Sequence, residues 1–299
     1  MADTVNLQSN INNIISWSQS NNMVLNKNKF EYISHKLSTD NKNLKSLKSL
    51  PLYNEHMTYK ASGCIDIPPS TWVRDLGVYV DNELNWDHHI FTITKKAKQI
   101  SGWVLSVFYS REKNIMLTLF NSLIRTKLEY CCEIWCPYLM KHINTLEQIQ
   151  RSFTHRIDGM QDFDYWERLS ILKITSLQRR REKLIILHIW KILNNIYPNS
   201  INLQFKEHHR TTAIKAILKP LPKIKGKSLT KYEESFQING AKLWNLLPTE
   251  LTKITKLNYF KVELNKFLKH IPDKPPIPGY PFQNDNSLIK QCLSLNLKN

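Results

Sequence analysis

The sequence predicts an α+β fold that is predominantly helical. Apolar residues recur at helical spacing over most of the chain after residue 87, and this period indicates helices with one buried face. Short runs with strand-like composition cluster in the first 80 residues. Hydrophobic residues make up 41% of the 299 residues, which is sufficient for a packed core. We therefore expect a small antiparallel sheet followed by a larger helical region.

Residues 1–87 are expected to form the first region. Apolar residues at helical spacing predict a helix over residues 5–22. Three strands are predicted, over residues 23–34, 57–67 and 73–80. Pro68 and Pro69 separate the last two strands, because proline cannot donate a hydrogen bond to a sheet.

Two more regions are predicted to be mainly helical. In residues 88–200, apolar side chains recur on one face of each of four segments. These segments run from about residue 88 to 107, around Ile115–Leu123, around Ile143–Ile157, and over Leu177–Asn194. In residues 201–299, we expect a basic loop or weak β segment, two helices and a proline-rich tail. Their ranges are 206–231, Phe236–Leu247, Leu257–Leu268 and 271–283.

The charge of the chain points to a polyanionic partner. The net charge is +17, and residues 151–299 carry 26 basic and 12 acidic side chains, whereas residues 61–150 carry nine of each. A strongly basic half is typical of proteins that bind nucleic acid. Lysine outnumbers arginine 32 to 10, as an AT-rich gene would give. That bias does not explain why one part is neutral and another strongly positive.

Several function classes are disfavoured. The sequence has only seven glycines and neither of the common glycine-rich phosphate-binding motifs. The five cysteines are irregularly spaced, so a disulfide framework is not expected. No run of apolar residues is long enough to span a bilayer, and no secretory signal is visible. We expect an intracellular protein, nuclear or cytoplasmic, that makes no membrane contact.

Four groups of residues occur in a characteristic order. The first runs from Leu7-Gln8 through Trp17-Ser18 to Met23-Val-Leu-Asn26 and Lys29. The second is Arg74-Asp-Leu-Gly-Val-Tyr-Val-Asp81, followed by Leu84-Asn-Trp86 and His89-Ile90. The third comprises Leu128-Glu-Tyr130, Trp135-Cys-Pro137 and Leu146-Glu147 with Gln150-Arg151. The fourth comprises Phe236, Ala241, Trp244-Asn245, Leu247-Pro248 and Phe260-Lys261.

Together these motifs resemble the C-terminal part of a reverse transcriptase from jockey-like non-LTR retrotransposons. The resemblance implies a palm remnant over 1–87, a thumb-like helical region over 88–200 and a C-terminal region over 201–299. Such a polymerase synthesises DNA on an RNA template with Mg²⁺, which needs aspartate ligands in the palm. Beyond Asp3, the chain shows no counterpart of those aspartates. We therefore expect no cofactor in this chain, no synthesis by it alone, and non-specific binding of an RNA or DNA template–primer.

Two residues carry roles that the resemblance implies. Lys29 matches a palm lysine near the leaving pyrophosphate, although an exposed strand-edge lysine is the simpler interpretation. Gly77 matches a position that supports the primer, where a missing side chain permits close approach. A plain β-bulge at Gly77 fits equally well.

Basic residues outside the palm remnant are the candidate nucleic-acid contacts. Cationic side chains bind the phosphates of the backbone, and such contacts do not read the base sequence. The first set is Lys95, Lys96, Lys98, Arg111 and Lys113. The second set is Arg179, Arg180, Arg181, Lys215, Lys219, Lys223, Lys225 and Lys227. A solvated face without function is the alternative for both sets.

Other chemistry is weakly indicated. The His88-His89 and Cys132/Cys136 pairs lack the spacing of a zinc site, so no metal ligand is assigned. Four tryptophans are predicted to be core anchors rather than base-stacking platforms; they are Trp103, Trp135, Trp190 and Trp244. The alternative function is a decayed or co-opted helical module that binds a protein partner.

Overall fold

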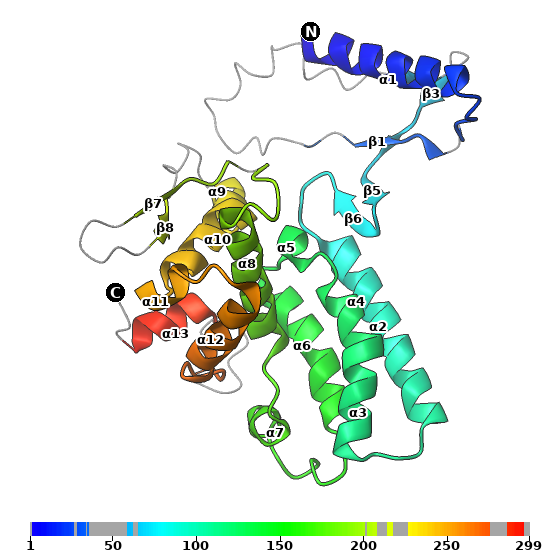
Figure 1. Cartoon of the computed structure of the whole chain (residues 1–299). Coiled ribbons are helices and arrows are strands. Elements are labelled where there is room, and N and C mark those ends of the chain that lie inside the picture. The colour runs from blue at the N-terminus through cyan, green and yellow to red at the C-terminus, as the bar shows by residue number, and fades with distance from the viewer. Residues whose placement is uncertain are drawn as a thin grey trace. The chain divides into compact units, whose positions relative to one another are not determined.

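The computed structural model describes residues 2–26, 29–33, 35, 59–61, 65–200, 202–207, 214–217, 227–275 and 286–295. Within these residues the chain has the predicted α+β architecture, in which helices predominate and the strands form small pairs (Figure 1). The chain divides into two compact units. One comprises Met1–His89 with Lys223–Ser228, and the other, which we call the helical unit, comprises Ile90–Pro222 with Leu229–Asn299.

Within its described residues, the first unit contains one complete helix and six short strands. Helix α1 covers Ala2–Ser20, close to its predicted range. The strands are β1 (Tyr32–Ile33), β2 (Tyr59–Ala61), β3 (Ile65–Ile67), β4 (Pro69–Ser70), β5 (Trp72–Asp75) and β6 (Val78–Asp81). The pairs β2–β3 and β5–β6 are antiparallel, as expected, but β1 pairs with β4 in parallel. Of the predicted strand over 23–34, the described residues form only the two-residue β1, and residues 27, 28 and 34 lie outside them.

The segment predicted as one strand over 73–80 is a hairpin. Strands β5 and β6 close at the pair Asp75–Val78, which leaves Leu76 and Gly77 as a two-residue turn. Both turn residues have positive φ, 44° at Leu76 and 91° at Gly77. Turns of this kind match the twist of the paired strands and favour glycine. The conformational need for Gly77 is therefore the hairpin turn, and the bulge interpretation is wrong.

Asp81 organises the connection that leaves this hairpin. Its Oδ1 accepts hydrogen bonds from the backbone N–H groups of Glu83 and Asn85, each at 3.0 Å. Its Oδ2 accepts one from Trp86 N–H at 2.8 Å. One carboxylate thus satisfies three backbone donors in a loop that has no ladder partners.

The helical unit begins within α2, which covers Asp87–Val107. Four elements lie within the predicted helical ranges or extend them by a few residues. They are α3 (Lys113–Leu119), the π-helical turn η4 (Phe120–Ile124), α4 (Arg125–Glu129) and α6 (Met140–Thr154). Five short helices were not predicted: Cys132–Trp135 (α5), Tyr165–Leu172 (α7), Lys227–Glu233, Thr249–Thr252 and Leu288–Ser294. The Phe120 and Phe153 rings, 5.1 Å apart, join η4 to α6.

The remaining elements follow α8, which covers Leu177–Leu193. They are the antiparallel pair β7 (Phe205–Glu207) and β8 (Ile214–Ala216), then α9 (Lys227–Glu233), α10 (Phe236–Asn245), α11 (Thr249–Thr252), α12 (Leu257–Lys269) and α13 (Leu288–Ser294). Helix α8 contacts α5, α6 and α10. It is therefore the central helix of this unit, as Figure 1 shows.

Three tryptophans anchor the core of the helical unit, as predicted. Trp135, Trp190 and Trp244 are all buried. The Trp190 ring stacks on Phe260 of α12 at 5.5 Å, and its Nε1 donates to the Ile254 carbonyl at 2.7 Å. Each buried indole thus gains packing area and keeps its N–H satisfied.

Candidate nucleic-acid interface

Helix α2 has one buried face and one exposed face. Ile90, Thr94, Ala97 and Val104 are buried, and their spacing of three, four and seven residues places them on one side of the helix. Thr94 donates its hydroxyl hydrogen to the Ile90 carbonyl at 2.6 Å, so this buried hydroxyl is satisfied. These buried residues form a stripe along α2, and the side chains outside the stripe face solvent.

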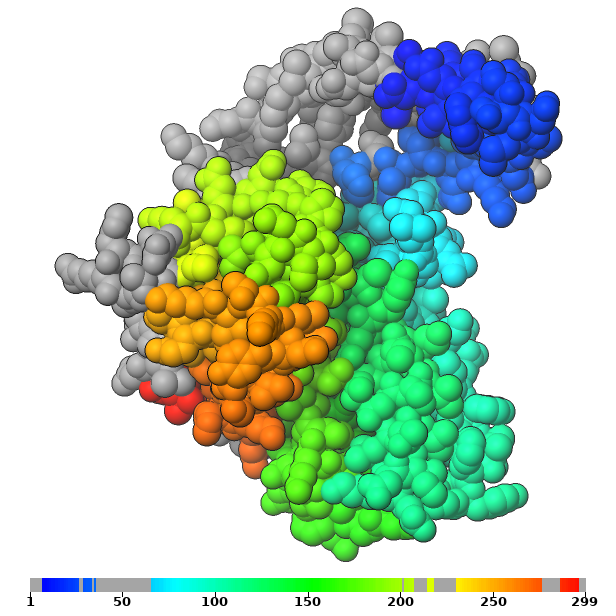
Figure 2. Space-filling model, in the orientation of Figure 1, coloured from blue at the N-terminus to red at the C-terminus, as the bar shows by residue number. Residues whose placement is uncertain are grey.

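The exposed face of α2 combines three lysines with two aromatic side chains. Lys95, Lys96 and Lys98 are exposed, Phe91 is 65% exposed and Trp103 is 55% exposed. The prediction that Trp103 is a core anchor is wrong, because it lies outside the buried stripe. Cations that contact phosphates beside aromatic rings that stack on bases are the usual elements of a sequence-tolerant nucleic-acid surface. We call these five residues the α2 face; in Figure 2, α2 lies at an outer edge of the helical unit.

Arg111 and Lys113 have structural partners. Arg111 folds back on the end of α2, where Nη2 donates to the Leu105 carbonyl at 2.7 Å and Nη1 donates to the Phe108 carbonyl. Lys113 Nζ donates to the Ile171 carbonyl at the end of α7, at 2.9 Å. Both side chains satisfy orphan carbonyls at helix C-termini. Any phosphate would have to compete with these hydrogen bonds.

Two residues of the predicted basic run are in the core. Arg179 and Arg181 are each 1% exposed, so the prediction that they contact nucleic acid is corrected. Arg179 donates to the Pro272 carbonyl at 2.9 Å and lies 3.4 Å from Glu182 Oε2. Arg180 differs from its neighbours, because its side chain is 24% exposed and forms a two-pronged ion pair with Glu129.

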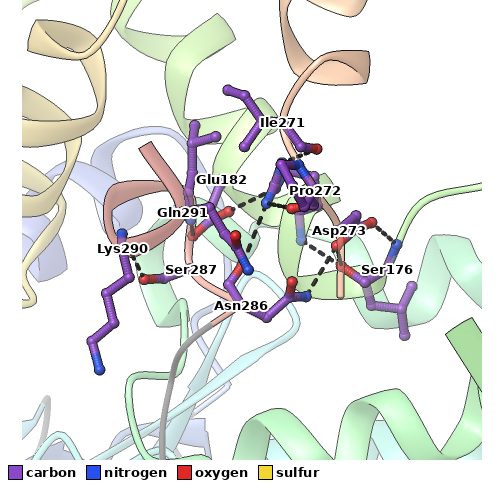
Figure 3. Close-up of polar contacts among 12 residues, drawn as sticks. Ser176, Glu182, Ile271, Pro272, Asp273, Asn286, Ser287, Lys290 and Gln291 are labelled. Carbon is purple, nitrogen blue, oxygen red and sulfur yellow. Dashed lines mark hydrogen bonds and ion pairs between the residues drawn. The ribbon is translucent and has the colours of Figure 1, made fainter. Parts of the chain in front are cut away.

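Arg179 belongs to a polar network at the N-terminus of α8, and Figure 3 labels other members of this network. Asp273 accepts hydrogen bonds from the Ser176 N–H and hydroxyl, both at 2.7 Å, and from the Asn286 amide at 3.0 Å. Glu182 Oε1 accepts the N–H of Leu288 at 2.9 Å. Segments about 100 residues apart in the chain are thereby joined to one helix end.

Burial shifts the pKa values of the carboxyl groups in this region. Burial raises the pKa of Glu182 to about 7, although the nearby Arg179 charge opposes the shift. Burial also raises the pKa of Glu147, which Tyr165 and Arg181 partly oppose. Tyr165 donates its hydroxyl hydrogen to Glu147. Glu182 is paired with Arg179 and Glu147 with Tyr165, so their perturbed pKa values indicate structural pairing inside the core rather than an accessible catalytic site.

Other predicted site residues are dispersed. Lys29 is exposed, and its N–H donates to the Asn26 carbonyl at 3.1 Å rather than to a neighbouring strand. Gly77 occupies the hairpin turn described above. Lys215 donates to the carbonyls of Asn245 and Leu247, at 2.8 and 3.3 Å. Lys219, Lys223, Lys225 and the side chain of Lys227 lie outside the described residues.

A cavity of about 470 Å³ lies beside α5 and α8. The His188 ring stands between those of Tyr197 and Phe236, with centroids 5.0 and 5.1 Å away. Burial lowers the pKa of His188, and its Nδ1 is 4.0 Å from Glu133 Oε1. Ser200 also lines the cavity, but no hydrogen bond joins it to His188 in the described structure, so a charge-relay arrangement is not formed.

In the described part of the chain, no group of three or more His, Cys, Asp or Glu side chains is placed to hold a metal ion. None of the helices in this part of the chain combines the length and the apolar composition needed to cross a bilayer.

Comparison with known proteins finds similarity to a nematode protein. Uncharacterized protein B0403.1 of Caenorhabditis elegans is 27% identical over 127 residues, which is 42% of this chain. The match covers 62% of the worm protein's own length. No protein family model matches the sequence, and no solved structure matches it.

The α2 face is therefore the surface that best combines charge, exposure and aromatic side chains among the predicted residues. Sequence reasoning missed a second basic group, Arg125, Lys183 and Lys261, which join Arg180 around Glu129. Arg180 was predicted from its charge run. The other three come from three separate segments of sequence, so no local signal could have grouped them.

Proposed function

We propose that the chain is part of a non-LTR retrotransposon reverse transcriptase, and that the α2 face holds its template–primer without reading sequence. The observation that carries this proposal is the exposure of Lys95, Lys96 and Lys98 on one helix beside Phe91 and Trp103. The four ordered sequence motifs support the assignment to the polymerase. RNA-templated synthesis belongs to the whole enzyme, and the part proposed for these residues is backbone binding.

The mechanism of this binding follows from the side chains. Each lysine ammonium replaces counterions on a phosphate, and the release of those ions favours binding at low salt. The Trp103 and Phe91 rings add stacking or sugar contacts that do not depend on base identity. Gly102 lies on the same side of the helix, and nothing lies within 4 Å of a Cβ placed there. A nucleic-acid backbone can therefore approach the helix at this point.

Salt titration of binding to a 20-base-pair DNA duplex tests the proposal. The wild-type chain is expected to show a slope of log affinity against log salt of about −5 or steeper. The triple variant Lys95→Gln/Lys96→Gln/Lys98→Gln is expected to reduce the magnitude of that slope by about 2 to 3.

A matched triple variant provides the control. Lys141→Gln/Lys256→Gln/Lys269→Gln removes the same charge from exposed positions away from α2. If both triple variants change the slope equally, only net charge matters and the α2 face is not the site.

A helical protein-interaction module is the second candidate function. The large exposed aromatic side chains on α2 favour it, because exposed apolar patches often mark protein interfaces. A complex that survives nuclease and high salt, and that Trp103→Ala disrupts, would support this candidate over nucleic-acid binding.

A further inference from the structure

Three cations from two helices lie around the Glu129 carboxylate, and a fourth cation, Lys261, lies near Lys183. Glu129 and Arg125 belong to α4, Arg180 and Lys183 to α8, and Lys261 to α12. The Glu129 carboxylate contacts both arginines. The charge of Lys183 interacts with those of Arg125, Arg180, Lys261 and Glu129. We call these five residues the Glu129 cluster; it contains four positive charges and one negative charge.

Glu129 already forms an ion pair with Arg180. Arg180 Nη2 donates to Glu129 Oε2 at 2.9 Å, and its Nε donates to Oε1. This two-pronged geometry fixes the Arg180 guanidinium and uses both carboxylate oxygens. Arg125 Nε lies 3.8 Å from Oε2, which is too long for a hydrogen bond.

Donors consequently remain available in the cluster. Within the described residues, neither the Arg125 guanidinium nor the Lys183 ammonium makes a hydrogen bond to a protein acceptor. The Arg125 side chain is 22% exposed and that of Arg180 is 24% exposed, so a small anion in solvent can reach both. Lys183 lies three residues after Arg180 on α8, which places it on the same side of that helix.

The electrostatic balance also favours an anion. Burial and the Arg180 charge lower the pKa of Arg125, and Glu129 only partly opposes them. Burial and the charges of Arg180, Arg125 and Lys261 lower the pKa of Lys183. Like charges held together at partly buried positions repel one another, because water screens them incompletely. A bound anion would relieve that repulsion.

We propose that the Glu129 cluster binds a phosphate group through the free donors of Arg125 and Lys183. Arg180 contributes a positioned charge, and Lys261 contributes a further charge at the rim. A guanidinium beside an ammonium matches the tetrahedral oxygens of phosphate, whereas a carboxylate ligand would occupy fewer donors. The phosphate can come from a nucleic-acid backbone or from a free phosphorylated molecule. The site shares no residue with the α2 face and does not depend on that face's function.

Calorimetric titration of the full chain with inorganic pyrophosphate, at low ionic strength, tests the free-ligand source. One pyrophosphate is expected per chain, and Arg125→Gln/Lys183→Gln should weaken its binding at least tenfold. Binding of the 20-base-pair duplex tests the backbone source. There, the same double variant should lower the magnitude of the salt slope by about 2. A weaker interaction in either titration supports the site. The titration in which it occurs shows whether the phosphate comes from a free molecule or from a nucleic-acid backbone.

Lys127→Gln is the matched control, because Lys127 is an exposed cation of the same helix α4. It should leave both measurements unchanged. Lys261→Gln provides an independent variant at an exposed position, outside the core. It should weaken binding of the same ligand, pyrophosphate or duplex, about threefold, and this test holds even if the double variant unfolds. The Lys95, Lys96 and Lys98 triple variant should retain pyrophosphate binding. Unchanged binding in both arms, by the folded double variant or by Lys261→Gln, would overturn the proposal.

Discussion

Asp273 accepts two hydrogen bonds from Ser176, a residue 97 positions earlier in the chain. The Ser176 N–H and the Ser176 hydroxyl each donate to this carboxylate at 2.7 Å. Ser176 is also the N-cap of α8, where its oxygen accepts the Arg179 N–H at 3.1 Å. The N-terminus of the central helix is thus completed by a residue that lies beyond α12.

Replacing Asp273 should destabilise the helical unit. Asp273→Ala removes an acceptor that binds three donors and leaves the Ser176 N–H inside the structure without its partner. We expect a loss of about 2–4 kcal/mol in the free energy of unfolding, because hydrogen bonds to charged groups are the stronger ones. Urea denaturation measures it. Asp162→Ala, at an exposed loop position, should change the value by less than about 0.5 kcal/mol.

Glu182 should make the helical unit less stable as the pH rises. Its pKa is about 7 in the folded chain and near 4.5 in the unfolded chain. Between these values the folded state therefore holds more protons. Its contribution to stability is present below pH 4.5 and is lost as the pH rises through about 7, by up to ~3 kcal/mol.

Glu182→Gln is the variant that isolates this contribution. Its unfolding free energy, compared with that of the wild type at pH 5 and pH 8, should lack the Glu182 component of the pH dependence. Glu250→Gln, at an exposed helix position, should keep the wild-type dependence. If the wild type and Glu182→Gln show parallel pH profiles, Glu182 is ionised in the core throughout this range.

His89 should have the opposite pH effect in the first unit. Its Nδ1 accepts the Tyr79 N–H at 3.2 Å, and burial together with the His88 charge lowers its pKa to about 4. The folded state therefore binds fewer protons than the unfolded state between pH 4 and 6.5. The stability present above pH 6.5 should decline as the pH falls towards 4, by about 1–3 kcal/mol.

The Tyr79 amide resonance, followed by NMR over this range, reports the loss of the hydrogen bond. His89→Phe should remove this component of the acid sensitivity, whereas His155→Gln at an exposed position should not. A Tyr79 resonance that stays constant down to pH 4 would contradict this account of His89.

Two helical glycines should respond oppositely to alanine. A Cβ on Gly240 of α10 would lie 2.8 Å from Ile189 Cδ1 and 3.4 Å from Ile185 Cγ2 on α8. Gly102 of α2 is exposed and has no atom within 4 Å of the same position. Gly102→Ala should stabilise the chain by up to ~1 kcal/mol through helix propensity. Gly240→Ala should destabilise it by about 1–2 kcal/mol through overpacking. Thermal unfolding of both variants measures the difference, and a gain in stability from Gly240→Ala would show that Ile189 can shift freely.

The long helices could be predicted because one physical property defines them. In α2, α6, α8 and α12 the apolar residues recur at helical spacing, and that face is the one the core buries. Helix α7 was missed because it has only eight residues. Its signal was nevertheless present, since Asp164 and Glu167 form a capping box in which each side chain accepts the other's backbone N–H.

The exposure of individual charges could not be predicted in the same way. Arg179, Arg180 and Arg181 are adjacent and identical in type, yet only Arg180 reaches solvent. What distinguishes Arg179 is the carbonyl of Pro272, which lies 93 residues later. The α2 lysines could be located because their helix has a single buried face, whereas α8 is covered on several sides.

The closure of the α8 N-terminus also bears on how the chain folds. Arg179 and the carbonyl of Asn286 are 107 residues apart in sequence, so this contact closes one of the longest loops in the helical unit. The chain loses conformational entropy when such a loop closes, before the contact contributes any stabilisation. During synthesis, α8 emerges before residues 271–286, which supply the carbonyl partners of Arg179. We expect α10 and α12 to pack on α8 first and the polar network to close last.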